Sequence, residues 1–167
     1  RLVGSQAIGH TRYSTAGDTT KLNAQPFSVV CNKGHLAVAH NGNMVNADVL
    51  RGHLEAAGSI FQSSSDTEVL LHLYARARMG PVEDAIASSL LKVRGAYSLL
   101  FLTKDALIAA RDPMGIRPLA LGRLGEAWVV SSETCAFDLI EATYVRDVAP
   151  GEILVIDQAG LRSYFPF

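Results

Sequence analysis

The sequence predicts an α+β fold in which helices pack outside a largely antiparallel sheet system. Three observations support this prediction. Short strand candidates come first, three segments with helical periodicity follow, and the second half of the chain returns to strands separated by turn residues. Because strands and helices are segregated along the chain instead of alternating, the pattern favours separate layers over βαβ units.

The first half of the chain contains three strand candidates, at 7–12, 27–32 and 36–40. Lys33-Gly34 lies between the last two, and a short glycine-containing link of this kind is typical of an antiparallel hairpin. We therefore expect the second and third candidates to pair.

Apolar residues then recur at helical spacing, which predicts helices over 46–57, 66–79 and 81–93. Ser65 precedes the second segment and Glu68 follows three residues later, which is the spacing of a capping box. The third segment begins at a proline, a residue favoured at the first position of a helix.

The second half of the chain is predicted to form six strands, spaced as in antiparallel sheets: 96–103, 106–111, 119–122, 127–131, 144–148 and 152–156. No repeat, low-complexity tract or linker interrupts the 167 residues. One domain over 1–167 is therefore expected.

The composition excludes several classes of protein. Lysine plus arginine total 15 and aspartate plus glutamate total 16, for a net charge of −1. Without a clustered basic surplus, no nucleic-acid partner is expected. The two cysteines cannot form a disulfide framework, and no apolar run approaches the roughly 20 residues that span a bilayer. We expect a cytoplasmic protein with no membrane partner.

Three polar segments are candidates for chemistry. In the first, over 10–17, a predicted strand ends in a hydroxyl-rich turn with Arg12 at its edge. A guanidinium group presents a planar set of donors that suits a carboxylate. The alternative is a surface arginine beside a turn whose hydroxyls bond to the local backbone.

The second segment, over 40–43, follows an apolar strand. The Asn41 amide and the Gly42 N–H, side by side on a sharp turn, are the two neutral donors that an oxyanion hole requires. Asn-Gly is also the strongest signal for a hairpin turn, so a simple tight reversal explains the pair equally well.

The third segment, over 63–68, begins a predicted helix. Asp66 there could receive an ammonium group, and with Arg12 it would match the two charged ends of an α-amino acid. The alternative is structural, because carboxylates are stabilised at the positive end of a helix dipole.

Arg12, Asn41-Gly42 and 66–68 stand in the order in which class II glutamine amidotransferases carry such residues. Further segments resemble one branch of that class, the glutaminase domain of the amidophosphoribosyltransferase family. They are 10–17, the turn over 111–119, 132–135 and 146–152.

This resemblance implies a four-layer α/β/β/α sandwich of the N-terminal nucleophile hydrolase type. It also implies that an N-terminal cysteine thiolate attacks the side-chain amide of glutamine and releases ammonia. Carried onto this sequence, Arg12 would hold the glutamine carboxylate and Asp66 its ammonium group. Asn41 and Gly42 would bind the oxyanion, and Thr15 would line or cover the pocket.

The resemblance also implies what this sequence does not contain. The family's nucleophile cysteine and N-terminal strands precede 7–12, and its phosphoribosyltransferase domain follows the glutaminase domain. We expect the 1–167 domain to be truncated at both ends and inactive by itself. In the whole enzyme, ammonia would convert phosphoribosyl pyrophosphate to phosphoribosylamine in de novo purine biosynthesis.

The cofactors and assembly that the resemblance implies lie largely outside this sequence. Cys135 stands in a context, over 132–138, that resembles the first ligand of a 4Fe-4S cluster in some members, although a plain buried thiol is an equal alternative. No cofactor is expected within 1–167 itself. Magnesium would belong to the transferase domain, and the whole enzyme would be a homo-oligomer.

Two other functions stay open. One is the glutaminase domain of another class II amidotransferase, such as glucosamine-6-phosphate synthase or glutamate synthase. The other is a non-catalytic module that binds glutamine or contacts a subunit.

Overall fold

The strands form two antiparallel sheets in the part of the chain that the computed structural model describes, residues 4–11 and 21–167. The larger sheet has six strands in the order β1-β2-β3-β4-β8-β9: β1 (Phe27–Cys31), β2 (Gly34–Met44), β3 (Gly95–Leu102), β4 (Ala106–Arg111), β8 (Ile153–Asp157) and β9 (Gly160–Tyr164). The smaller sheet has three strands in the order β6-β5-β7: β5 (Ala120–Leu124), β6 (Ala127–Ser131) and β7 (Thr143–Asp147).

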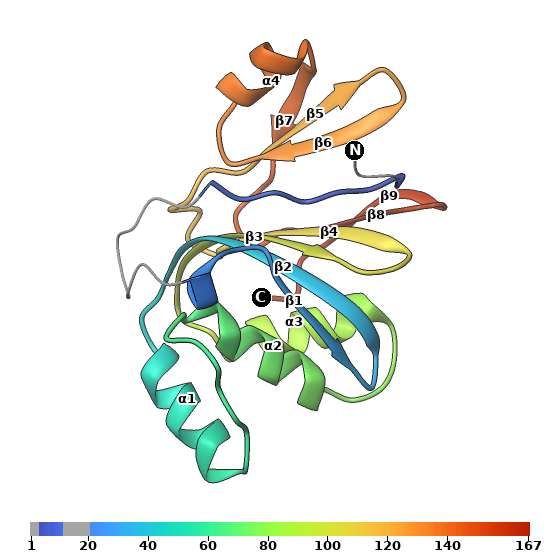
Figure 1. Cartoon of the computed structure of the whole chain (residues 1–167). Helices are drawn as coiled ribbons and strands as arrows, with labels where there is room; N and C mark the ends of the chain where they lie inside the picture. The colour runs from blue at the N-terminus through green and yellow to red at the C-terminus, as the bar shows by residue number, and fades with distance from the viewer. Residues whose placement is uncertain (1–3, 12–20) are drawn as a thin grey trace.

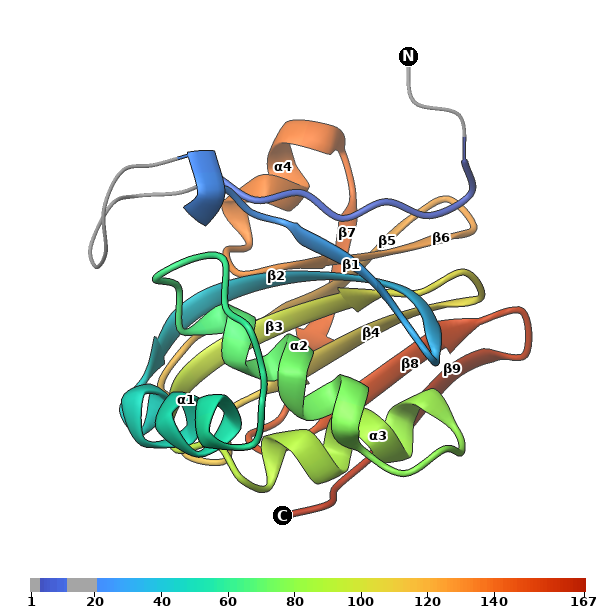
Figure 2. The same cartoon turned by 60° about the horizontal axis from the view of Figure 1, so that its bottom comes forward.

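Helices cover the outer faces of this pair of sheets (Figures 1 and 2). One face of the six-stranded sheet packs against α1 (Ala47–Ala56), α2 (Thr67–Arg76) and α3 (Val82–Leu90). Its other face looks toward the three-stranded sheet, and α4 (Cys135–Ile140) lies on the far side of that sheet. The predicted antiparallel α+β fold and its four α/β/β/α layers are confirmed.

Alternation along the central strands creates the two apolar cores. In β4, Ile108 belongs to the core under the helices, whereas Ala109 belongs to the core shared with the smaller sheet. In β8, Val155 belongs to the core under the helices and Leu154 to the core shared with the smaller sheet. Successive side chains of a strand point to opposite faces, so a strand buried on both faces is apolar at every position.

Several predicted elements differ from the observed ones at their ends. The helix predicted over 66–79 ends at Arg76, because Ala77 has an extended backbone with ψ 156°. The strand predicted over 7–12 is wrong in its described part, since 7–11 belong to neither sheet. The 3-10 turn Lys21–Asn23, α4 and β9 were not predicted, because each is short and α4 leaves apolar side chains such as Leu139 exposed.

The turn between the two sheets is built on a buried carboxylate. Asp112 is fully buried and accepts hydrogen bonds from the backbone N–H groups of Met114, Ile116 and Arg117 at 3.0–3.1 Å and from that of Tyr97 at 3.3 Å. The predicted turn over 111–119 is therefore confirmed, and its geometry depends on one side chain.

Arg111 holds the same turn from its other side. Its guanidinium donates to the carbonyl oxygens of Gly115, Arg117 and Val148 at 2.7–3.0 Å. Since the turn over 111–119 leads from β4 into β5, these bonds determine how the chain enters the smaller sheet.

Within 4–11 and 21–167, no helix is long and apolar enough to cross a membrane.

Replacement of Asp112 by asparagine should destabilise the fold. The Asp112→Asn variant keeps the size of the side chain but removes the charge that binds four backbone N–H groups, and we expect a loss of about 3 kcal/mol in the free energy of unfolding. Urea denaturation measures this loss. The exposed turn residue Asp105 supplies the control, Asp105→Asn, which should change the free energy by less than about 0.5 kcal/mol. Equal effects of the two variants would contradict the role given to Asp112.

Candidate functional site

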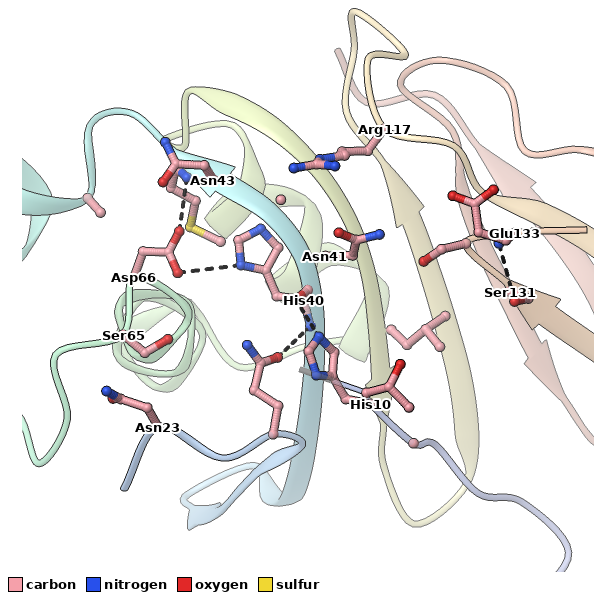
Figure 3. Close-up of a pocket in the computed structure, with 18 of the residues that line it drawn as sticks. His10, Asn23, His40, Asn41, Asn43, Ser65, Asp66, Arg117, Ser131 and Glu133 are labelled. Carbon is pink, nitrogen blue, oxygen red and sulfur yellow. Dashed lines mark hydrogen bonds and ion pairs between the residues drawn. The ribbon is translucent and has the colours of Figure 1, made fainter. Parts of the chain in front are cut away.

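A polar cavity of about 1060 Å³ opens beside β2, between the start of α2 and the smaller sheet (Figure 3). Segments from several parts of the chain contribute to its wall, among them those that carry His10, Asn41, Asp66, Arg117 and Glu133. The cavity thus brings together residues that are more than 100 positions apart in sequence.

Asn41 and Gly42 lie inside β2 and not on a sharp turn, which corrects the geometry expected for them. They pair with Ser98 and Tyr97 of β3. Gly42 has a φ of 152°, and a Cβ atom there would lie 2.1 Å from the carbonyl oxygen of Ala96. Only glycine therefore allows β3 to approach at this position.

The free edge of β2 explains how Gly42 can act as a donor. The N–H of His40 donates to Gln25 Oε1 at 2.7 Å, and the N–H of Met44 donates to Asp66 Oδ2 at 3.0 Å, both on the side away from β3. Alternate residues of a strand direct their N–H groups to the same side. By this alternation we infer that the N–H of Gly42 is directed to the same side as these two bonds. Gly42 and Asn41 both line the cavity, and Figure 3 shows the Asn41 side chain there.

Asp66 immediately precedes α2, and its carboxylate lines the cavity. Oδ2 accepts the N–H of Met44, and Oδ1 accepts the hydroxyl of Thr67 at 3.3 Å and lies 3.5 Å from Nδ1 of His40. Burial raises the pKa of this carboxyl, but the interaction with His40 and the hydrogen bonds from Met44 and Thr67 outweigh burial, so the pKa lies below its ordinary value. Asp66 is thus an ionised group whose side chain is still 24% exposed.

His40 is a buried neighbour of this carboxylate that the sequence analysis did not assign to the site. Its Nδ1 lies 3.1 Å from the hydroxyl oxygen of Thr67, and its carbonyl oxygen is 3.0 Å from Nε2 of His10. One feature of the sequence could have indicated a role for His40. It is a histidine that directly follows the apolar run 36–39, in a strand whose other buried side chains there are apolar. Arg117 and Glu133 were likewise not predicted to line the cavity.

The serine-rich loop before α2 is held by Glu68. Its carboxylate accepts the N–H groups of Gln62 and Ser63 at 2.8 and 2.7 Å and the Ser63 hydroxyl at 2.6 Å. The predicted capping box is wrong in both halves. The Ser65 hydroxyl accepts the N–H of Thr67 at 3.3 Å and not that of Glu68, and the Glu68 side chain binds 62–63 instead of reaching back to Ser65.

Not every predicted site residue can be placed. Arg12 and Thr15 lie outside the described residues. Cys135 is exposed in the first turn of α4 and does not line the cavity, so the buried-thiol alternative is wrong. In the described part of the chain, no three His, Cys, Asp or Glu side chains are grouped so that they could hold a metal ion.

Comparison with known proteins adds a family to this geometry. The family described as "Glutamine amidotransferase domain" matches residues 10–138. The amidophosphoribosyltransferase of Bacillus subtilis is 51% identical over 164 residues, which are 98% of this chain and 34% of that protein. Amidophosphoribosyltransferase 1, chloroplastic, of Arabidopsis thaliana is 54% identical over 164 residues, or 98% of this chain and 29% of that protein.

Solved structures agree with these sequence matches. The glutamine phosphoribosylpyrophosphate amidotransferase of B. subtilis, complexed with ADP and GMP, superposes with a TM-score of 0.89 at 49% identity. The match covers 95% of this chain and 34% of that one. The chain therefore spans about a third of the length of the relatives it matches.

The free energy of unfolding should depend on pH in the acid range, because the loop before α2 is held by the Glu68 carboxylate. Burial raises the pKa of Glu68, but its hydrogen bonds to Ser63 and Gln62 outweigh burial and leave the pKa below the ordinary 4.5. The stability that Glu68 contributes is therefore complete above pH 4.5 and is lost as the pH falls through the lower, folded-state value. We expect Glu68→Gln to reduce the free energy of unfolding by about 2 kcal/mol at pH 7, and the difference from wild type should shrink below pH 4.5.

Denaturation at a series of pH values measures this difference. The control is Glu55→Gln on the exposed face of α1, which should follow the wild-type curve. A difference between wild type and Glu68→Gln that stays constant into strong acid would show that the Glu68 carboxylate is not the stabilising group.

Proposed function

The chain belongs to the glutamine amidotransferase family, and on that premise we propose that it is the glutamine-hydrolysing domain of an amidophosphoribosyltransferase. The observation that supports this most directly is the cavity, in which Asp66, Asn41 and Gly42 meet. The relatives named above support the choice of enzyme within the family, because they match 98% of this chain at 51–54% identity. Glucosamine-6-phosphate synthase and glutamate synthase are therefore the weaker alternatives.

Glutamine would bind with its α-ammonium group on Asp66. The carboxylate is ionised, lines the cavity and is only partly exposed, which makes a charge-assisted hydrogen bond stronger than in open water. We propose that Arg12 binds the substrate's carboxylate and that Thr15 lines or covers the pocket, as the resemblance implies.

The side-chain amide of glutamine would then lie beside Asn41 and Gly42. When a thiolate attacks the amide carbon, the carbonyl oxygen becomes an oxyanion, and two neutral N–H donors fixed beforehand stabilise it without reorganisation. The Gly42 N–H is held by strand geometry and the Asn41 side chain faces the same cavity (Figure 3). This pair of donors is what the site offers to catalysis.

The nucleophile in this proposal is an N-terminal cysteine of the intact protein. Neither Cys31 nor Cys135 lines the cavity. The α-amino group of the N-terminal cysteine would act as base and take the proton of its own thiol. The sulfur would then form a thioester as the carbon–nitrogen bond of the amide breaks, and the nitrogen would take up that proton and leave as ammonia. Water would then cleave the thioester, which returns the thiol and releases glutamate.

The whole reaction proposed for the intact protein continues in a phosphoribosyltransferase domain. There ammonia would displace pyrophosphate from phosphoribosyl pyrophosphate and form phosphoribosylamine, an early compound of purine biosynthesis. The names of the matched relatives support this step. Magnesium in that domain, a homo-oligomer, a cytoplasmic location and the inactivity of 1–167 alone remain predictions.

Removal of the Asn41 amide tests the proposed function. In the intact protein, Asn41→Ala should lower kcat for ammonia release from glutamine by about 100-fold, because one oxyanion donor is lost. The matched control is Asn32→Ala on the exposed turn between β1 and β2, which should leave the rate unchanged. Glutamine binding with no ammonia release from the wild-type protein would instead favour the non-catalytic module.

For Cys135 we propose the role that the resemblance implies, one of four thiolate ligands of a 4Fe-4S cluster. Because Cys135 is exposed, its sulfur is accessible to a cluster whose other ligands come from another part of the protein. Iron and sulfide analysis of the intact protein should find both in the wild type and in Cys31→Ser, and neither in Cys135→Ser. Iron-free wild-type protein, or iron retained in Cys135→Ser, would contradict this role.

A further inference from the structure

We propose that His40 and Thr67 are positioning residues that hold the Asp66 carboxylate in place for the ammonium group of the substrate. This inference rests on the proposed function, since it assigns two residues to the recognition of glutamine. It starts from an unusual feature of α2: Asp66 precedes the helix, yet its side chain makes no hydrogen bond to the helix N–H groups. An aspartate at this position ordinarily caps its own helix.

The hydrogen bonds of Asp66 turn it toward β2 instead. Oδ2 accepts the N–H of Met44 at 3.0 Å, and Oδ1 accepts the hydroxyl of Thr67 at 3.3 Å. Each oxygen is thus fixed from the protein side. The remaining lone pairs face the cavity, where an ammonium group with three donors would find them.

The direction of the Thr67 hydroxyl determines what His40 does. An ionised carboxylate only accepts hydrogen bonds, so the single hydroxyl hydrogen of Thr67 points to Asp66. The contact of 3.1 Å between His40 Nδ1 and the Thr67 oxygen therefore needs its hydrogen on Nδ1. Hydrogen bonds then run from His40 to Thr67 and from Thr67 to Asp66, and the same Nδ1 also lies 3.5 Å from Asp66 Oδ1.

His40 is well suited to anchor this relay because it is buried and its backbone is held on both sides. Its side chain is only 1% exposed, its N–H donates to Gln25 and its carbonyl oxygen lies beside His10. The other ring nitrogen, Nε2, is buried with no hydrogen-bond partner among the described residues. The ring therefore makes its polar contacts through Nδ1. The unpaired Nε2 costs stability, because a buried polar atom without a hydrogen bond is unfavourable.

Two pairs of substitutions separate positioning from packing. The side-chain nitrogen of asparagine falls near Nδ1 of histidine, whereas that of glutamine falls near Nε2. His40→Asn therefore retains the donor to Thr67 and His40→Gln loses it. In the same way, Thr67→Ser retains the hydroxyl and Thr67→Val removes it at nearly constant volume.

The test is the steady-state kinetics of ammonia release by the intact protein. We expect His40→Gln and Thr67→Val to raise KM for glutamine by about 10-fold and to change kcat by less than about 2-fold, because a hydrogen bond that orients bound substrate is lost. His40→Asn and Thr67→Ser should stay within about 3-fold of the wild-type KM. The second substrate is 4-carbamoylbutanoate, which is glutamine without its α-amino group, and its KM should be the same in all five proteins.

Each outcome bears on one proposal. Equal KM values in His40→Asn and His40→Gln, or in Thr67→Ser and Thr67→Val, would overturn the positioning role, and so would an equal rise for the substrate that lacks the amino group. Thermal melting of each variant identifies a loss of folding, and the Thr67 pair then decides if a His40 variant does not fold. An Asp66→Asn variant that binds glutamine as well as wild type would refute the proposed function itself.

Discussion

The buried carboxylate of Asp112 is the interaction on which the arrangement of the two sheets depends. This group is fully buried. It accepts hydrogen bonds from three N–H groups of the turn over 111–119 and from the N–H of Tyr97 on β3. The turn is thereby fixed to the larger sheet at the point where the chain departs for the smaller one. Arg117, whose N–H is among those bound, is placed on the cavity wall by the same bonds.

The cavity exists because β2 is longer than its neighbour on one side. β1 pairs with β2 only from Gly34 to Val38, so the rest of that edge has no strand beside it among the described residues. In an ordinary sheet such an edge would recruit another strand. Here the N–H groups of this edge are bound by side chains, at His40 and Met44, or are directed into the cavity, at Gly42. An unpaired strand edge thus becomes a binding surface.

Local sequence signals predicted most helices and strands, because periodicity reflects which face is buried. They failed at Asn41-Gly42, where a dipeptide typical of hairpin turns is held in a strand by pairing with β3, a constraint from 50 or more positions away. The contact between His40 and Thr67 spans 27 positions and joins a strand to a helix, so no local pattern contains it. Resemblance to a family pointed to Asp66 as a ligand group, but not to the bonds that orient it.

The strand order of the larger sheet also has a consequence for the newly made chain. β8 pairs with β4, yet it begins at residue 153 whereas β4 ends at residue 111, with the whole smaller sheet between them. At a synthesis rate of about 5–20 residues per second, these 153 − 111 = 42 residues take roughly 2–8 s to appear. During that interval the apolar edge of β4 has no partner strand, which exposes the nascent protein to aggregation through this edge.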